Sequence, residues 1–300
     1  MFEYVSPIPP ELRFTRLQDR QTQVLLPDEP CFPELHAFQT IPGECRVMFY
    51  KAYCGGSLWN LIKRYAECEG SVPEPFIWHV MEQLTRAIIF LAAGLTREDL
   101  QKGNRRPGKG YKKIVHRDIL ASNTLLDFPL LKEGDPSTDD DLGDVFPRVV
   151  LTNWQNAGRE GDAEQWIAPG GFVNSQLLAS RSAPQPPDHR EDVYCLGRIL
   201  RMMVTYRDHY KYRKENTIDI DHDQPYLEDW LDKSWKSGVC PYTNELIDLL
   251  MHFETSNGIH GSMFDSETVR KKEIFDQGKD VNFLIGTVLP TATKRMRRYR

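Results

Sequence analysis

Apolar residues recur at helical spacing in several stretches of the chain. The longest stretch covers residues 76–95, and its repeat of three or four positions is typical of one long, buried helix. Its apolar positions are Ile77, Val80, Met81, Leu84, Ile88 and Leu91. Shorter amphipathic stretches at residues 193–204, 226–235 and 243–253 predict further helices. The pattern therefore indicates a chain that is mainly helical.

Strand signals are shorter and fewer. An apolar and aromatic run at residues 46–53 leads into two glycines, which predicts a strand, a turn and the start of a helix. Residues 124–127 and 148–152 are two more strand candidates, and we expect them to pair as a hairpin. Residues 128–147, which separate them, are rich in aspartate and are interpreted as a solvated acidic insertion. Helices and a few strands together predict the α+β class.

The two ends of the chain lack a clear period. Prolines interrupt residues 1–34, so we expect an extended N-terminal segment that is loosely attached. Residues 35–54 carry the first strand signal, and residues 55–270 contain the predicted helices. Residues 271–300 are interpreted as a C-terminal extension. Its basic tail is either a solvated end or an address for the nucleus or an anionic surface.

Composition narrows the class of protein. The net charge of -5 creates no overall basic field, so we expect neither a nucleic-acid nor a membrane partner. The six cysteines include no Cys-x-x-Cys pair, which argues against a zinc site and against a secreted disulfide scaffold. No apolar run reaches the length of a membrane span, and the first residues do not resemble a signal peptide. We expect a soluble intracellular protein, cytoplasmic or nuclear.

The most specific motif lies at residues 116–123. His116, Arg117 and Asp118 are followed by Asn123, so an acid and an amide are five positions apart in one loop. In-line phosphoryl transfer needs a carboxylate beside the attacking hydroxyl, and a separate oxygen ligand for magnesium in the same loop. The alternative interpretation is a polar turn whose side chains cap backbone groups.

On these residues the chain resembles the eukaryotic protein kinase family over residues 35–255. Ile114-Val115 before the motif and Thr124-Leu125-Leu126 after it follow the family's catalytic loop in order and spacing. Residues 47–53 look like the hinge strand between the two lobes, and residues 192–197 like the start of the central helix. The resemblance implies a protein-kinase-like fold, mainly the helical C-terminal lobe (residues 55–270) with a remnant of the small β lobe (residues 35–54).

The resemblance also implies roles for single residues. Asp118 would lie beside the attacking hydroxyl, and Arg117 would bind a phosphate of the activation segment. His116 and Asp192 would be structural, with Asp192 accepting backbone hydrogen bonds from the catalytic loop. The implied cofactors are ATP and Mg, with Asn123 and Asn153 as the metal ligands. The implied ATP contacts are Tyr50, Lys51, Tyr53 and Leu125.

Several residues that this catalysis needs have no counterpart in the sequence. The first lysine of the chain is Lys51, in the hinge-like run, so no earlier lysine can orient the phosphates. Gly43 is the only glycine before Gly55, so a glycine-rich loop over the phosphates has no candidate. Asn153-Trp154-Gln155 stands at the position of the family's Asp-Phe-Gly. An amide in place of that carboxylate should weaken magnesium binding.

The catalytic-loop motif and the segment after it depart from the family as well. Residues 120–122 of the motif carry no positive charge. Ala168-Pro169-Gly170 stands in place of the family's Ala-Pro-Glu, and residues 255–262, where the arginine partner of that Glu would lie, contain no arginine. Residues 153–169 contain no Ser, Thr or Tyr that could be phosphorylated. In place of a phosphate, an acid at position 160, 162 or 164 could pair with Arg117, unless these acids are simply solvated.

We therefore expect a protein-kinase-like domain that is weak or inactive in phosphoryl transfer to protein Ser/Thr. One alternative is an active kinase whose small lobe is not part of this sequence. A second is a docking module that binds a protein partner and no nucleotide. A small-molecule kinase is a third, against which Arg117 and the helix that begins near Asp192 argue.

Overall fold

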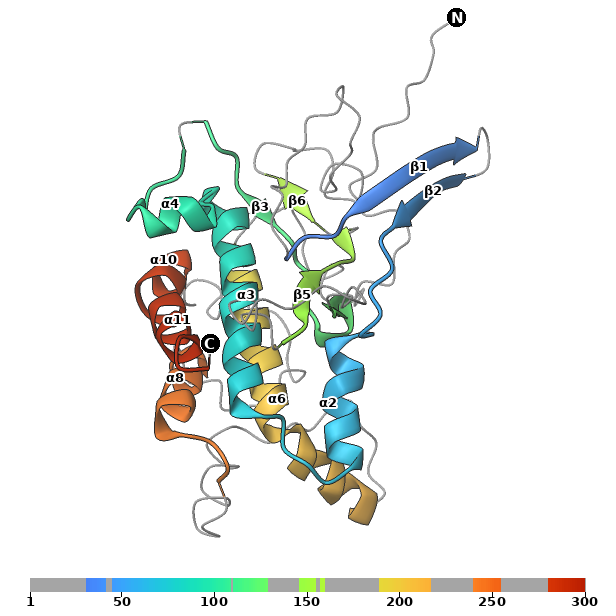
Figure 1. Cartoon of the computed structure of the whole chain (residues 1–300), viewed down its shortest axis with the longest axis vertical. Helices are drawn as coiled ribbons and strands as arrows, with labels where there is room; N and C mark the ends of the chain where they lie inside the picture. The colour runs from blue at the N-terminus through green and yellow to red at the C-terminus, as the bar shows by residue number, and fades with distance from the viewer. Residues whose placement is uncertain are drawn as a thin grey trace, which may run out of the picture.

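The chain folds as a helical body to which three two-stranded sheets are attached. The computed structural model describes residues 31–41, 45–108, 110–128, 146–154, 157–159, 189–216, 240–254 and 280–299. Within these ranges helices dominate and every sheet has two strands, which confirms the expected mixture of α and β structure. One hairpin reaches away from the helices at the upper right of Figure 1.

The central element is α3 (Glu74–Ala93), which confirms the longest predicted helix. It follows Pro73 and ends at Gly94, whose φ of +67° is the left-handed conformation that glycine adopts without strain. Sixteen of its residues are buried. Among the described helices it alone is long and apolar enough to cross a membrane, but 89% of its most apolar window is buried inside the fold. Burial in a protein core accounts for its composition.

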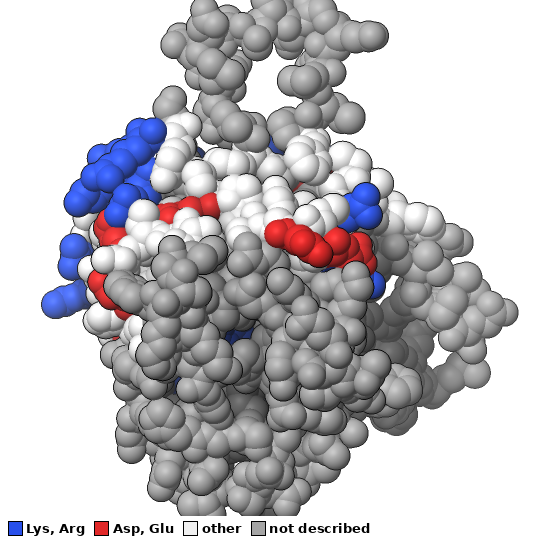
Figure 2. Space-filling view, turned by 90° about the horizontal axis from the view of Figure 1, so that it is seen from below, with Lys and Arg blue, Asp and Glu red and all other residues white. Residues whose placement is uncertain are grey.

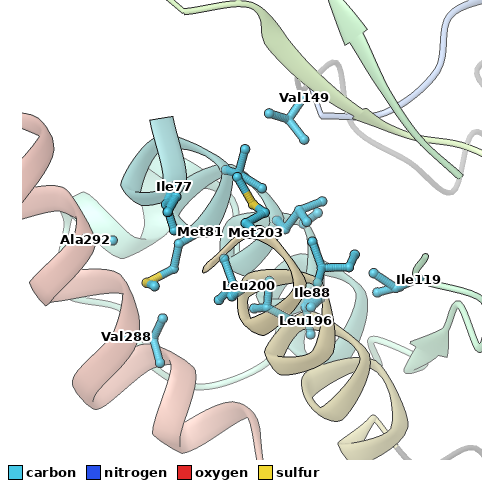
Figure 3. Packing of buried hydrophobic residues seen from close by; sticks show 14 of the residues in the cluster. Ile77, Met81, Ile88, Ile119, Val149, Leu196, Leu200, Met203, Val288 and Ala292 are labelled. Carbon is cyan, nitrogen blue, oxygen red and sulfur yellow. The ribbon is translucent and has the colours of Figure 1, made fainter. Parts of the chain in front are cut away.

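Helix α6 (Arg190–Asn216) and a C-terminal group of helices pack directly against α3. Helices α2 (Leu58–Glu67) and α8 (Asn244–Glu254) in turn pack against α6. Leu196, Leu200 and Met203 of α6 pack close to Met81 and Ile88 of α3 (Figure 3). Each large apolar side chain buried in this way stabilises the fold by about 1.5–3 kcal/mol relative to exposure. The predicted helix at residues 193–204 is thus confirmed, and it extends further at both ends.

The predicted hairpin after the catalytic-loop motif is confirmed. Strand β4 (Thr124–Asp127) pairs antiparallel with β5 (Arg148–Leu151), in a register that sets Thr124 opposite Leu151 and Asp127 opposite Arg148. A second pair, β3 (Ile114–Val115) with β6 (Gly158–Arg159), was not predicted. Two-residue strands are too short to show an alternating pattern.

The residues just before the predicted boundary at residue 34 pack against the body of the fold. Cys31 and Phe32 are buried, and the ring of Phe32 contacts those of Phe90 and Trp154 at centroid distances of 5.7 and 5.9 Å. Strand β1 (Leu35–Ile41) follows and pairs with β2 (Cys45–Tyr50). Only the second of these strands was expected. Residues 1–30 lie outside the described residues.

Residues 281–296, within the predicted C-terminal extension, are helical and pack against the core. These residues form α10 (Val281–Phe283), the π-helical segment η4 (Leu284–Val288) and α11 (Leu289–Met296). Leu284, Val288, Ala292 and Met296 are buried and pack against α3. These four residues recur every four positions, so they share one face of the helix. They form part of the core.

Two short elements complete the description. Helix α4 (Arg97–Gln101) follows α3, and the 3-10 turn η1 (Ala121–Asn123) lies directly before β4. The helix expected at residues 226–235 and most of the acidic insertion lie outside the described residues. Charge is unevenly distributed over the surface: Lys and Arg crowd the upper left edge of the face drawn in Figure 2.

Candidate functional site

The site is built on the loop between β3 and β4, which holds a conformation that needs support. Arg117 has a φ of +66°, in the left-handed region that residues other than glycine rarely adopt. Such a conformation persists only where surrounding contacts fix it. The contacts come from α6 on one side and from the end of β5 on the other.

Asp192, in the first turn of α6, holds the loop by two hydrogen bonds. Its Oδ2 accepts from the backbone N–H of His116 and its Oδ1 from that of Arg117, both at 2.8 Å. The residue is fully buried. Burial raises the pKa of its carboxyl to about 7, although the two backbone donors act in the opposite direction. This is the position and the contact that the resemblance implies for Asp192.

His116 fixes the loop from within. Its Nε2 lies 3.0 Å from the carbonyl oxygen of Thr152, while its Nδ1 accepts from the backbone N–H of Asp118 at 3.2 Å. Burial lowers the pKa of the imidazole to about 3, so the ring is neutral near pH 7. Because Nδ1 accepts, the proton resides on Nε2 and is donated to Thr152. The ring also meets that of Trp154 edge-on at 4.5 Å.

Asp118 is the point on which two amide side chains converge. The Nδ2 group of Asn123 donates to both the backbone oxygen and Oδ2 of Asp118, at 2.9 Å each. The Nδ2 group of Asn153 donates to the same Oδ2 at 2.8 Å. Asn153 follows β5 and has a φ of +65°, which asparagine tolerates better than most residues. The structure thus brings Asn153 from the end of β5 to Asp118 and Asn123, which lie in one loop.

The hairpin keeps these residues in register. The backbone N–H and the hydroxyl of Thr152 both donate to the carbonyl oxygen of Asn123, at 2.9 and 2.8 Å. Thr152 therefore links the Asn123 end of the loop to the strand that carries Asn153. Sequence reasoning did not include Thr152 or Trp154 among the site residues. A polar residue at the end of an apolar strand was the signal that could have identified Thr152.

Both amides direct an NH2 group, which cannot bind a cation, toward the single carboxylate of the site. In this orientation Asn123 and Asn153 would not be magnesium ligands. Magnesium in proteins is usually held by one or two carboxylates, with substrate phosphates and waters completing a near-octahedral arrangement. Within the described ranges, no cluster of three or more His, Cys, Asp or Glu side chains could hold a metal ion. Asp118 is thus the one carboxylate among the three residues, and both amides donate hydrogen bonds to it.

Arg117 faces an acid that sequence reasoning did not consider. Its Nε lies 4.0 Å from Oε2 of Glu191, and both side chains are largely buried. Glu191 directly precedes Asp192, so the same turn of α6 supports the backbone and the guanidinium of Arg117. The acids at positions 160, 162 and 164 lie outside the described residues.

The residues expected to contact ATP lie at the end of β2, in the segment that follows it and in β4. Lys51 Nζ forms an ion pair with Asp127 Oδ2 at 2.7 Å, which ties the segment after β2 to the end of β4. The hydroxyl of Tyr53 accepts from the backbone N–H of Glu34 at 2.8 Å. Tyr50 is exposed, and Leu125 is half-buried and forms a β-bridge with Ser57.

These contacts change the expected role of Lys51. Its ammonium group is already paired with a buried carboxylate, so it links two elements of the fold. Asp127 was not among the predicted site residues, because an acid at the end of a strand is common in solvated turns.

Comparison of the sequence with models of known protein families and with characterised proteins gave no match. The function is therefore argued from the site.

Proposed function

We propose that this chain is a protein-kinase-like domain that is weak or inactive in ATP-dependent phosphoryl transfer to protein Ser/Thr. The observation that carries the proposal is the pair of hydrogen bonds from His116 and Arg117 to the buried carboxylate of Asp192. A polar turn on the surface has no need of a buried acid from a helix about 75 residues away in sequence. The clustering of Asn123 with Asp118 adds support, since the resemblance places both at a catalytic centre.

Weak transfer follows from the same geometry. The transferred phosphoryl group carries negative charge that an efficient enzyme stabilises with metal ions and cations. Here Asn153 supplies an amide in place of a carboxylate, and the ammonium of Lys51 is engaged by Asp127. In the described part of the chain no further lysine lies at the hinge. The transition state would lose much of its charge stabilisation.

Thermal unfolding of the full chain with ATP, in EDTA and in magnesium, tests the proposal. A ligand at a hundredfold excess over its Kd stabilises the folded state by about 2.7 kcal/mol. We expect a small rise in melting temperature with ATP that depends little on magnesium. Asn153→Asp should enlarge the magnesium-dependent part, because it adds a carboxylate next to Asp118.

A second variant and the wild type define the outcomes that would contradict the proposal. Asp118→Ala removes the carboxylate at the centre of the site, and it should change the size of the rise in melting temperature that ATP causes. If neither the wild type nor Asn153→Asp responds to ATP under any condition, the nucleotide-binding part of the proposal fails. The domain would then be a docking module.

One observation favours that second candidate function. Phe49 and Tyr50, next to the hinge, are both exposed large apolar side chains. They are consecutive residues of β2, so their side chains leave opposite faces of the strand, and each is available to contact a protein partner on its own side. A protein substrate or docking partner inside the cell is thus part of the proposal in either form.

A further inference from the structure

A short basic segment stands out from an otherwise acidic chain. Residues 102–113, here called the basic loop, contain six Lys or Arg and no Asp or Glu: Lys102, Arg105, Arg106, Lys109, Lys112 and Lys113. The whole chain has a net charge of -5, so subtracting the loop's +6 leaves -11 for the remainder. The positive charge is therefore local.

The start of the basic loop is held by α4. Thr96 and Asp99 form a reciprocal capping box at the N-terminus of that helix. Asp99 then binds Asn104 twice, accepting from its backbone N–H at 2.9 Å and from its Nδ2 at 3.1 Å. Arg105 and Arg106 follow directly, so the position of their backbone is set by the cap.

The other end of the loop is held by Tyr111. Its hydroxyl donates to the carbonyl oxygens of Phe90 and Leu91, at 2.7 and 3.1 Å, at the end of α3. Its ring lies against Gly94, where a Cβ would meet ring atoms at 2.5 Å. Lys112 and Lys113 follow and lead straight into β3. Both ends are thus held, with Arg105 and Arg106 directly after one anchor and Lys112 and Lys113 directly after the other.

Three of these cations are available to a partner. Arg105, Arg106 and Lys112 are exposed, and none of the three has an ion-pair partner in the described part of the chain. Lys102 lies 3.8 Å from Glu98, but both side chains are well exposed and such a pair contributes little. Within the described residues, the charges of Arg105, Arg106 and Lys112 are therefore not neutralised by an ion pair.

The chemistry of the loop selects the partner. Its one aromatic side chain, Tyr111, is held against α3, which leaves none to stack on bases and little apolar surface to enter a lipid bilayer. An extended polyanion would also approach the acidic remainder of the molecule, whose field reaches about 8 Å at physiological salt. A short acidic segment meets the loop alone. We propose that the basic loop docks a short, strongly acidic segment of a protein partner.

Fluorescence anisotropy of a labelled octaglutamate peptide with the full chain tests this docking. The triple variant Arg105→Ala, Arg106→Ala, Lys112→Ala should bind roughly tenfold more weakly, since each exposed cation contributes modestly. The matched control is Lys294→Ala, Arg297→Ala, Arg298→Ala, which removes the same charge from exposed positions in the last turn of α11 and directly after it. The control should bind as the wild type does.

Three results would overturn the proposal. The peptide could fail to bind the wild type, or the two triple variants could lose binding equally, in which case net charge alone governs it. Single-stranded DNA or phosphatidylserine vesicles could displace the peptide at lower concentration, which would assign the loop to another class of partner. The inference does not depend on phosphotransfer, so loss of ATP binding leaves it standing.

Discussion

At the scale of single residues, the candidate site is organised by two buried side chains that bind the backbone of its loop. Asp192 and His116 are buried, and both bind backbone groups of the loop that carries Asp118. Their ionisation is perturbed because burial disfavours the charged form. The stability of the protein should therefore report on these two groups directly.

The first prediction concerns pH. The pKa of His116 is about 3 in the folded protein and about 6.5 when unfolded, so between these values the unfolded chain binds a proton that the folded chain does not. This costs the folded state up to about 1.4 kcal/mol per pH unit as pH falls. Asp192 acts in the opposite direction. Its folded pKa is about 7, so its contribution to stability falls as pH rises from about 4 to 7.

Because the two effects oppose one another, the comparison is made against a variant. His116→Phe should be less stable than the wild type at pH 7, by about 1–3 kcal/mol, because the carbonyl of Thr152 loses its donor. That gap should shrink toward pH 4. Urea unfolding at several pH values measures it, and a gap that stays constant with pH would contradict a buried neutral imidazole.

The second prediction concerns the Asp192 contacts. Asp192→Ala leaves the buried N–H groups of His116 and Arg117 without their acceptor, which should cost about 2–4 kcal/mol of unfolding free energy. Glu98→Gln is the exposed control. Its pair with Lys102 is well exposed on both sides, so its loss should cost under about 1 kcal/mol. Equal costs for the two variants, measured by urea unfolding, would show that Asp192 does not hold the loop.

At the scale of elements, the C-terminal helices are part of the core. The hydroxyl of Thr293 donates to the buried Glu82 of α3 at 3.0 Å, and Arg295 pairs with Glu245 of α8. Arg295 also lies over the ring of Trp78, 5.9 Å from its centroid. Polar and apolar contacts together fix α11 against α3 and α8.

The third prediction follows from that packing. Leu284→Ala removes a fully buried side chain at the start of η4 and should lower the unfolding free energy by about 2–5 kcal/mol. Lys294→Ala, an exposed change on α11, should leave it within about 0.5 kcal/mol. Thermal or urea unfolding distinguishes them. A Leu284→Ala variant as stable as Lys294→Ala would mean that this region is not part of the cooperative core.

At the scale of the whole molecule, the parts of the site come from distant stretches of sequence. Asp118 lies between β3 and β4, Asn153 follows β5, and Asp192 begins α6. The central helix α3 supports several of these elements, since it packs against β3, β5 and α6. The β1–β2 hairpin reaches outward from this body and is tied to it by Lys51 and Asp127 (Figure 1).

The sequence by itself determined the elements whose signals are local. The period of α3 and the β4–β5 strands could be predicted, because apolar spacing within one element sets which face is buried. The motif at residues 116–123 could be identified for the same reason, since its spacing is a property of one loop.

Only the tertiary structure decided which groups face one another. Several contacts of the site join residues that no periodicity relates. They are the hydrogen bonds from two amide groups to Asp118, the Arg117–Glu191 contact and the Lys51–Asp127 ion pair. The place of residues 284–296 in the core was also decided there, because the neighbouring basic tail obscured a four-residue apolar repeat. Long-range contacts depend on how whole elements pack, and a local pattern does not encode that packing.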